Sequence, residues 1–338
     1  VFGLSIVSLS NTPTETAIHA VVGAASPTKR VGKGNVDSDW DGTTTNWSSE
    51  VEGTPLLYAN EDTVTFDDTA VSDTVNITTI VGPTLATVDS DSTDFTFQGS
   101  AIGGSGSLVK DGASTLTINN ANTYTGPTLV SNGTVVAATL ADGGTASAFG
   151  AATSDATNLV IESGATLRYP GATVSFNRGM TAGSGGFTFD VTNESTTVTH
   201  TGLLEGSGAL TKDGVGTLRL NGESTAFTGN VTNSVGILRI GNASAFGAFN
   251  SAFAKVTVED GSMIDFNGVW DAKYGYTIEG TGIGGAGALV HNGGGIWDTT
   301  AQTSNIKPSS DTSTGSTGHW ALLARRYAGP ARHRVAAG

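Results

Sequence analysis

Carboxylates are the side chains of this sequence that best suit a catalytic role, because several of them could lie close enough together to act as an acid and a base. Six of them lie in or beside segments of alternating polar and apolar residues: Asp190, Glu205, Glu259, Asp260, Asp265 and Asp271. Two carboxyl groups about 5 to 9 Å apart, one with a raised pKa, can cleave a glycosidic bond. Trp270 and Tyr274 lie near the last of them as candidate sugar platforms. These residues allow three interpretations. The protein could be a polysaccharide hydrolase or lyase, it could be a carbohydrate-binding module without turnover, or the acids could only keep the surface soluble.

A second group of acids has the spacing of a calcium loop. The stretch DSDWDG places Asp37, Asp39 and Asp41 at positions one, three and five and follows them with Gly42. That is the start of an EF-hand loop, although Ser48 stands where the acidic twelfth ligand belongs. Calcium is therefore the one metal that the sequence suggests, and a solvated lead-in turn is the alternative. No other cofactor is expected.

Several other kinds of chemistry find no match in the sequence. GTGIGG at 280–285 fits G-x-G-x-x-G, but no helix pattern follows it to bind a pyrophosphate. The five histidines are scattered and no G-x-S-x-G elbow occurs. The formal net charge of −14 argues against a nucleic-acid partner. With no cysteine, the chain has neither disulfides nor thiolate metal ligands.

The elements that position these residues belong to an internal repeat. The signature G-x-G-x-L-x-K-x-G reads GSGSLVKDG at 104–112, GSGALTKDG at 206–214 and, diverged, GAGALVHNG at 285–293. Lys110, Lys212 and His291 occupy the same place in the three copies. Each is predicted to be an exposed corner residue, with the lysines in weak surface ion pairs beside aspartates. Repetition favours structure, because a catalytic site need occur only once.

Short strands between turn residues predict an all-β solenoid. Runs such as DTVTFDD at 62–68 and GTLRLNG at 216–222 alternate with period two between Gly, Asn, Asp or Ser. A β-propeller needs four or more regular blades, whereas coils of a right-handed parallel β-helix tolerate loops of varying length. We therefore predict a β-helix of about ten coils and about 50 Å. It should span residues 37–298, between an N-terminal cap at 1–36, with a short helix at 14–25, and a Ser/Thr-rich linker and basic tail at 299–338.

Residues 104–138 and 206–242 closely resemble the autotransporter-associated β-strand repeat, also called the passenger-associated transport repeat. The shared pattern is the glycine-rich start, a Thr-Leu-x-Leu strand, an Asn-x-Tyr-x-Gly turn and a Gly-x-Leu strand. DWDGTTTNWS at 39–48 is similar to the Trp-bearing lead-in common before such repeats. The resemblance implies a secreted or cell-surface bacterial protein with a parallel β-helix stalk.

The function that best fits these observations is a structural or adhesive stalk without its own catalytic centre. The enzyme and the binding module remain alternatives, and a cell-surface or extracellular polysaccharide is the expected partner for either. No run of 18 apolar residues occurs, so no transmembrane helix is predicted.

Overall fold

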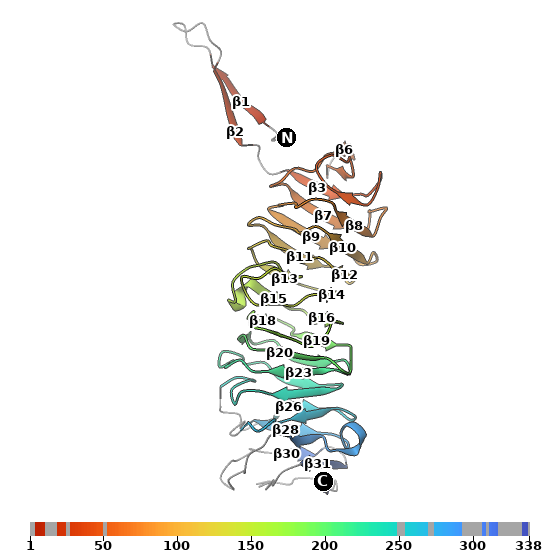
Figure 1. Ribbon diagram of the computed structural model, residues 1–338, viewed down its shortest axis with the longest axis vertical. Helices are drawn as coiled ribbons and strands as arrows, with labels where there is room; N and C mark the ends of the chain where they lie inside the picture. The colour runs from red at the N-terminus through yellow and green to blue at the C-terminus, as the bar shows by residue number, and fades with distance from the viewer. Residues whose placement is uncertain are drawn as a thin grey trace.

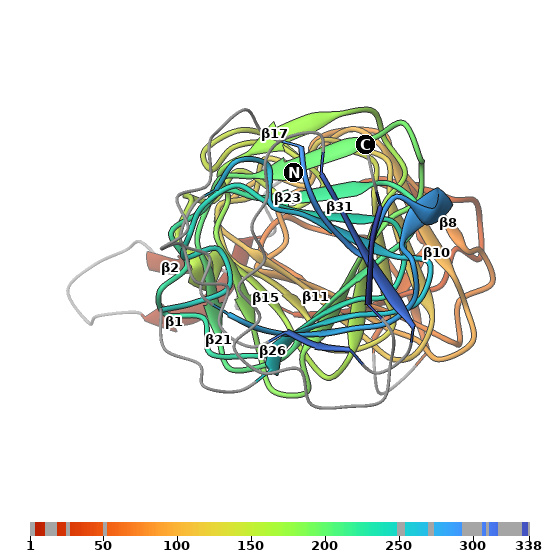
Figure 2. The ribbon, with the colours of Figure 1, turned by 90° about the horizontal axis from the view of Figure 1, so that it is seen from below.

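The structure is a computed structural model in which the chain winds into an elongated stack of coils (Figure 1). It describes residues 4–10, 19–24, 28–49, 53–248, 254–269, 274–292, 306–308, 311–316 and 333–336. Apart from one hairpin, the strands form three sheets that run along the same axis and surround a common interior (Figure 2). Within the described residues the only helical turns are two short 3-10 turns, η1 (Ala156–Asn158) and η2 (Ile283–Gly285).

The three sheets each take one side of the coil. The 12-stranded sheet contains β4 (Asp39–Trp40), β8 (Thr74–Ile77), β10 (Phe95–Gly99), β12 (Thr115–Ile118), β14 (Thr134–Ala137), β16 (Ala165–Tyr169), β19 (Phe187–Val191), β22 (Leu210–Asp213), β24 (Val231–Asn233), β26 (Ala254–Val258), β28 (Gly275–Ile278) and β30 (Ile306–Pro308). The 10-stranded sheet contains β3 (Lys29–Gly32), β5 (Trp47–Ser48), β6 (Pro55–Leu56), β7 (Thr63–Asp67), β9 (Leu85–Asp89), β11 (Ser107–Asp111), β13 (Thr128–Val130), β15 (Leu159–Ile161), β18 (Met180–Ala182) and β21 (Leu204–Gly206). The 8-stranded sheet contains β17 (Val174–Phe176), β20 (Thr197–His200), β23 (Thr217–Leu220), β25 (Ile237–Ile240), β27 (Met263–Asp265), β29 (Leu289–His291), β31 (Thr312–Ser316) and β32 (His333–Ala336).

Apart from β5 and β6, which pair antiparallel beside β3, neighbouring strands of the three sheets pair in parallel, which confirms the predicted all-β solenoid. Leu116 of β12, for example, lies opposite Phe95 of β10 and Val135 of β14. All three side chains are at most 1% exposed, so the inward residues of successive coils form a continuous core. Burying such a side chain contributes about 1.5 to 3 kcal/mol, which is how short strands become stable once stacked.

Aromatic residues cover the N-terminal end of this core. Trp40 and Trp47 are 1% and 2% exposed and pack against each other with ring centroids 5.5 Å apart. Tyr58 and Phe66 complete the cluster. The two tryptophans come from the lead-in that directly follows the segment predicted as a cap. Their burial removes the first coil's apolar side chains from water.

The N-terminal segment corrects one prediction. Instead of the short helix expected over residues 14–25, His19–Ala24 forms strand β2, which pairs antiparallel with β1 (Leu4–Ser10). The alternating VSLS pattern and the adjacent β-branched residues Val21 and Val22 within these stretches suit strands better than a helix. Parallel pairing within the coils already includes β3, which lies beside β7, and it extends past residue 298 through β30 and β31.

A buried histidine makes the stability of the coils sensitive to acid. His200 on β20 is 1% exposed, and its Nε2–H donates to the carbonyl of Arg178 at 2.8 Å. Burial lowers the pKa of His200 from 6.5 to about 4. The folded state therefore holds the ring neutral at pH values where the unfolded chain already binds a proton.

We expect the stability contributed by His200 to be complete above pH 6.5 and to fall as the pH approaches 4, by roughly 2 to 3 kcal/mol. Urea unfolding at pH 7.5 and pH 4.5 measures this loss. Because carboxylates also titrate in this range, the quantity to compare is the pH effect in the wild type against that in His200→Leu. A pH effect of equal size in both proteins would contradict the assignment.

Candidate functional site

Among the candidate catalytic carboxylates, Asp190 has a second carboxylate on the neighbouring strand of its sheet, that is, on the next rung of the stack. It lies on β19 and is 7% exposed, and its Oδ2 accepts a hydrogen bond from Arg168 Nε at 2.7 Å. On the other side it is the register partner of Asp213 on β22, about 4.8 Å away by strand spacing. These are stacked carboxylates of the kind that the sequence predicts, but an arginine already binds one of them.

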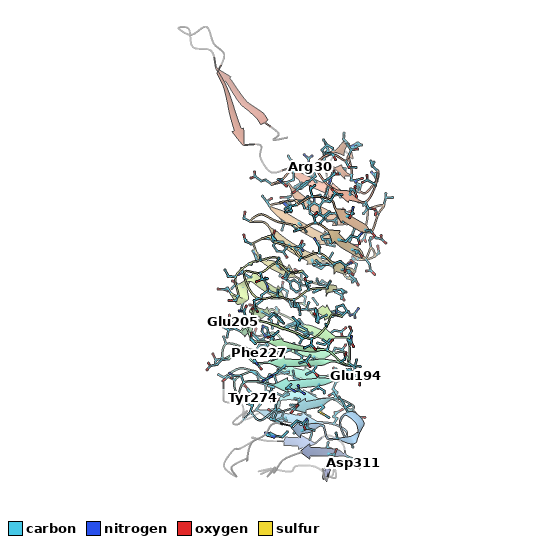
Figure 3. All side chains as sticks on the ribbon, viewed as in Figure 1. Arg30, Glu194, Glu205, Phe227, Tyr274 and Asp311 are labelled. Atoms are coloured by element: carbon cyan, nitrogen blue, oxygen red, sulfur yellow. The ribbon has the colours of Figure 1, made fainter. Side chains whose placement is uncertain are left out.

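The other predicted acids lie on different faces or far along the axis. Glu205 is on β21 of the 10-stranded sheet (Figure 3). Glu259 and Asp260 are exposed at the turn after β26, three strands from Asp190 in the 12-stranded sheet. Three rungs correspond to about 14 Å, which is beyond the separation used by paired glycosidase carboxylates. Asp271 lies outside the described residues.

Asp265 is buried in a hydrogen-bonded cluster on the 8-stranded sheet. It is 1% exposed and forms an ion pair with Arg239 Nε at 3.0 Å. It also accepts backbone hydrogen bonds from Asn267 at 2.8 Å and Asn292 at 3.2 Å. With its oxygens occupied in this way, Asp265 orients an arginine and two turns.

The two aromatic candidates do not form a sugar platform. Trp270 lies outside the described residues. Tyr274 is fully buried, and its hydroxyl oxygen lies 2.8 and 2.9 Å from the carbonyl oxygens of Ala243 and Gly247, which share its one proton. The prediction for Tyr274 is therefore wrong, because its ring packs in the core beside Phe246.

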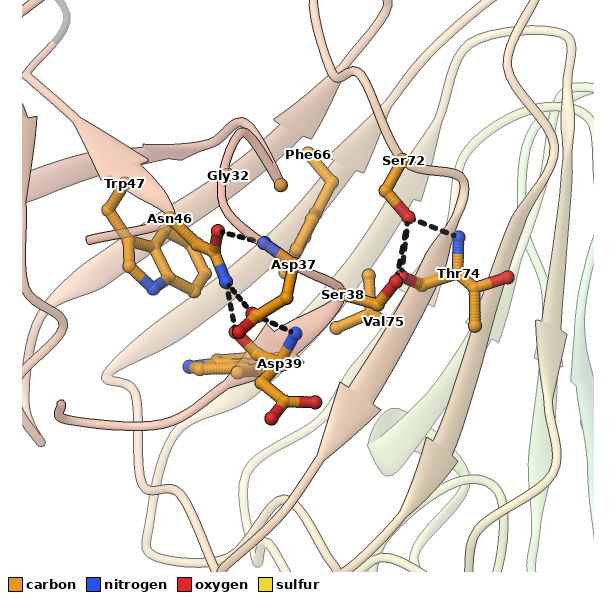
Figure 4. A pocket seen from close by; sticks show the side chains of 12 residues that line it. Gly32, Asp37, Ser38, Asp39, Asn46, Trp47, Phe66, Ser72, Thr74 and Val75 are labelled. Atoms are coloured by element: carbon orange, nitrogen blue, oxygen red, sulfur yellow. Dashed lines mark hydrogen bonds between the residues drawn. The ribbon is translucent and has the colours of Figure 1, made fainter. Parts of the chain in front are cut away.

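The three lead-in aspartates bind the protein itself. Asp37 Oδ1 accepts from the backbone of Asp39 and from Asn46 Nδ2 (Figure 4). Asp39 Oδ1 accepts from Asn76 Nδ2, and Asp41 accepts from its own turn. Within the described residues no three or more His, Asp or Glu are grouped to hold a metal ion. The aspartates therefore hold the turns of the lead-in, and calcium binding stays a prediction.

A small cavity lies beneath this lead-in. It has a volume of about 20 Å³, and its lining includes Trp40, Trp47, Asn46 and Ser38 (Figure 4). A space of this size holds about one water molecule and no sugar ring.

The repeated lysines are not exposed corner residues, and this is a second correction. Lys110 and Lys212 are both 0% exposed. Lys212 Nζ donates to the carbonyls of Asp213, Gly214 and Val235 at 2.7, 2.6 and 3.0 Å. Lys110 Nζ donates in the same way to Asp111 and Gly112. The ammonium group thus satisfies carbonyls that the tight turn leaves without a strand partner. His291, also predicted to be exposed, is 2% exposed.

The three copies of the signature lie on three different faces of the rod. Its first strand is β11 in the 10-stranded sheet, β22 in the 12-stranded sheet and β29 in the 8-stranded sheet. A repeated ligand site would need its copies to face one way along the rod. The signature residues therefore stabilise the turns at the corners of the coils and do not form a regular row of binding sites.

One outward surface is unusually regular. Seven consecutive register pairs on the 12-stranded sheet join Thr115, Thr134, Thr166, Thr188, Thr211, Thr232, Thr257 and Thr277. All eight side chains are half-buried. Seven rung spacings make this threonine column about 34 Å long. β-Branched side chains at these positions favour the strand conformation and pack along the pleat.

Together these features define the class of protein: a parallel β-helix rod whose repeated residues hold its corners. Two stretches, residues 108–137 and 210–240, match the family of the passenger-associated-transport-repeat. The chain therefore contains these repeats, and the predicted resemblance is confirmed.

The comparison with curated proteins finds an adhesin. Over 122 residues, 36% of this chain, the sequence is 49% identical to the "Adhesin BmaC autotransporter" of Brucella suis biovar 1 (strain 1330). The match covers 4% of that protein's length. No solved structure matches significantly. Within the described residues, no helix is long and apolar enough to cross a membrane.

Proposed function

We propose that this chain is a stalk segment of a bacterial surface adhesin, secreted or held at the cell surface, without a catalytic centre of its own. The observation that carries the proposal is the uninterrupted threonine column. Its eight hydroxyl side chains are uncharged and evenly spaced, which suits a structural surface along a rod, and none of them is a carboxylate or imidazole that could act as an acid or a base. The identity with an autotransporter adhesin supports the adhesive role. The positions of the predicted acids support a structural role, since Asp190, Glu205 and Asp265, which lie on strands, each belong to a different sheet.

A paired assay on the purified chain tests this function. Incubation with a panel of soluble and plant polysaccharides should release neither reducing ends nor unsaturated products. Beads coated with the chain should adhere to cultured epithelial cells more than albumin-coated beads do, and heat-denatured chain should lose this difference. Product formation that scales with protein concentration would favour the enzyme alternative. Adhesion no greater than that of albumin would contradict the adhesive role.

A further inference from the structure

Two arginines are stacked on the outward face of the 8-stranded sheet. Arg219 on β23 is the register partner of Arg239 on β25, so their Cα atoms lie about one strand spacing, 4.8 Å, apart. Both side chains are half-buried on the outer face, between inward-facing leucine and isoleucine residues. Like charges directly opposite each other on neighbouring strands are destabilising.

Arg219 differs from the other arginines of the coils. Five arginines occur between residues 28 and 292. Four of them bind protein groups: Arg30 binds Asp62, Arg168 binds Asp190, Arg239 binds Asp265, and Arg178 binds backbone carbonyls. Arg219 has no acidic partner among the described residues, and its Nε is buried without a hydrogen-bond acceptor. Nε itself is out of reach of a ligand, but the terminal nitrogens of this outward-facing, half-buried side chain have no acceptor among the described residues and remain for a group from outside the protein.

The arginine next to it is held in place by Asp265. Arg239 uses Nε for Asp265 Oδ2 at 3.0 Å and is 28% exposed, so its two terminal nitrogens remain for another acceptor. Asp265 cannot also neutralise Arg219, because it lies two rungs from it and is already bound by the backbone of Asn267 and Asn292. The pair therefore carries an excess of one positive charge over its acidic partner.

The same column continues with hydroxyl groups. Arg219 is the register partner of Thr199 on β20, and Thr199 is the partner of Ser175 on β17. Ser175 is exposed and Thr199 is half-buried. A chain lying along this column would meet two hydroxyls and then two guanidinium groups over three rung spacings, about 14 Å.

We propose that Arg219 and Arg239 form a binding site for a carboxylated polysaccharide, with Thr199 and Ser175 as hydrogen-bonding neighbours for sugar hydroxyls. Guanidinium groups bind carboxylates through two parallel hydrogen bonds, and this geometry favours arginine over lysine. A nucleic acid is disfavoured, because the two rungs beside the arginine pair offer the hydroxyl groups of Thr199 and Ser175 and no further cation for its closely spaced phosphates. The inference goes beyond the stalk function and does not depend on it.

Binding of sodium polygalacturonate to the purified chain, followed by calorimetry, tests the site. At an ionic strength of about 50 mM we expect saturable binding that weakens as salt is added. Arg219→Gln should weaken it about tenfold or more, because it removes a charge-assisted pair of hydrogen bonds. Arg219→Lys keeps the charge without the planar fork and should give an intermediate affinity.

Arg168→Gln is the matched control, since Arg168 is 44% exposed, paired with an aspartate and located on a different sheet. It should leave the affinity within about twofold, and thermal unfolding of all variants should show that each is folded. Neutral dextran should not bind, and polyglutamate, which offers carboxylates without sugar hydroxyls, should bind more weakly. The proposal is overturned if the wild type does not bind, if Arg219→Gln binds as the wild type does, or if polyglutamate binds as tightly as polygalacturonate.

Discussion

Replacing Gly208 with alanine should destabilise the protein by about 3 to 5 kcal/mol. A Cβ at Gly208 would lie 1.9 Å from the carbonyl oxygen of Gly183 and 2.8 Å from the Cα of Gly186. Both obstacles are backbone atoms of the preceding coil, so no side-chain rotation can relieve the clash. Gly229 in the next coil would in turn place its Cβ 1.8 Å from the carbonyl of Gly208. Glycine at this corner therefore sets how closely successive coils approach.

Gly42→Ala is the matched control for Gly208→Ala. Its Cβ would meet its nearest neighbour, the carbonyl oxygen of Tyr58, at an ordinary 3.5 Å. Neither glycine has a positive φ, so the two substitutions differ mainly in the space available. Thermal and urea unfolding should show a change below about 1 kcal/mol for Gly42→Ala. Similar losses for the two variants would contradict the close stacking at this corner.

Lys212→Met should also destabilise the protein by about 3 to 5 kcal/mol. Methionine fills a similar volume but leaves the carbonyls of Asp213, Gly214 and Val235 without their donor. Burial lowers the pKa of Lys212 to about 8, while the nearby charges of Asp213 and Asp190 oppose this shift. The side chain is therefore still mainly an ammonium at pH 7 and can donate to all three carbonyls.

Lys33→Met provides the comparison for Lys212→Met. Lys33 is partly exposed and its Nζ lies 3.9 Å from Asp67, so its loss should cost less than about 1 kcal/mol. Urea unfolding at pH 7 measures both variants. If Lys212→Met unfolded at the same urea concentration as Lys33→Met, the repeat lysine would be the surface residue that its sequence context suggests.

The sequence predicted the architecture well because the relevant signals are local. Alternation in runs such as TLRL, with glycine or asparagine at each end, identifies an inward and an outward face without knowledge of the fold. The repeat register then indicated stacked units. The threonine column follows from the same alternation, but it becomes visible only when the coil length between successive threonines is known. The intervals range from 19 residues, between Thr115 and Thr134, to 32, between Thr134 and Thr166.

The roles of individual polar residues were harder to predict. Lys110 and Lys212 stand beside aspartate and glycine, a context typical of exposed turns, and nothing local shows that the ammonium turns inward to the carbonyls. The sheet in which each copy of the signature lies depends on the lengths of all the strands and corners between the copies, and the sequence alone does not give these lengths. Arg219 and Arg239 are 20 residues apart, and only their register across β23 and β25 makes them neighbours.

The most direct test of the parallel coils uses the absence of cysteine from the chain. Thr188 and Thr211 are register partners on adjacent strands, whereas Thr188 and Thr232 are two rungs apart. Rung spacings of about 4.8 and 9.6 Å place the first pair within, and the second pair beyond, the Cα separation that a disulfide spans. The double variant Thr188→Cys with Thr211→Cys should therefore form an intramolecular disulfide on mild oxidation, and Thr188→Cys with Thr232→Cys should remain reduced. Crosslinking of the second pair in preference to the first would contradict the stacked, in-register β-helix.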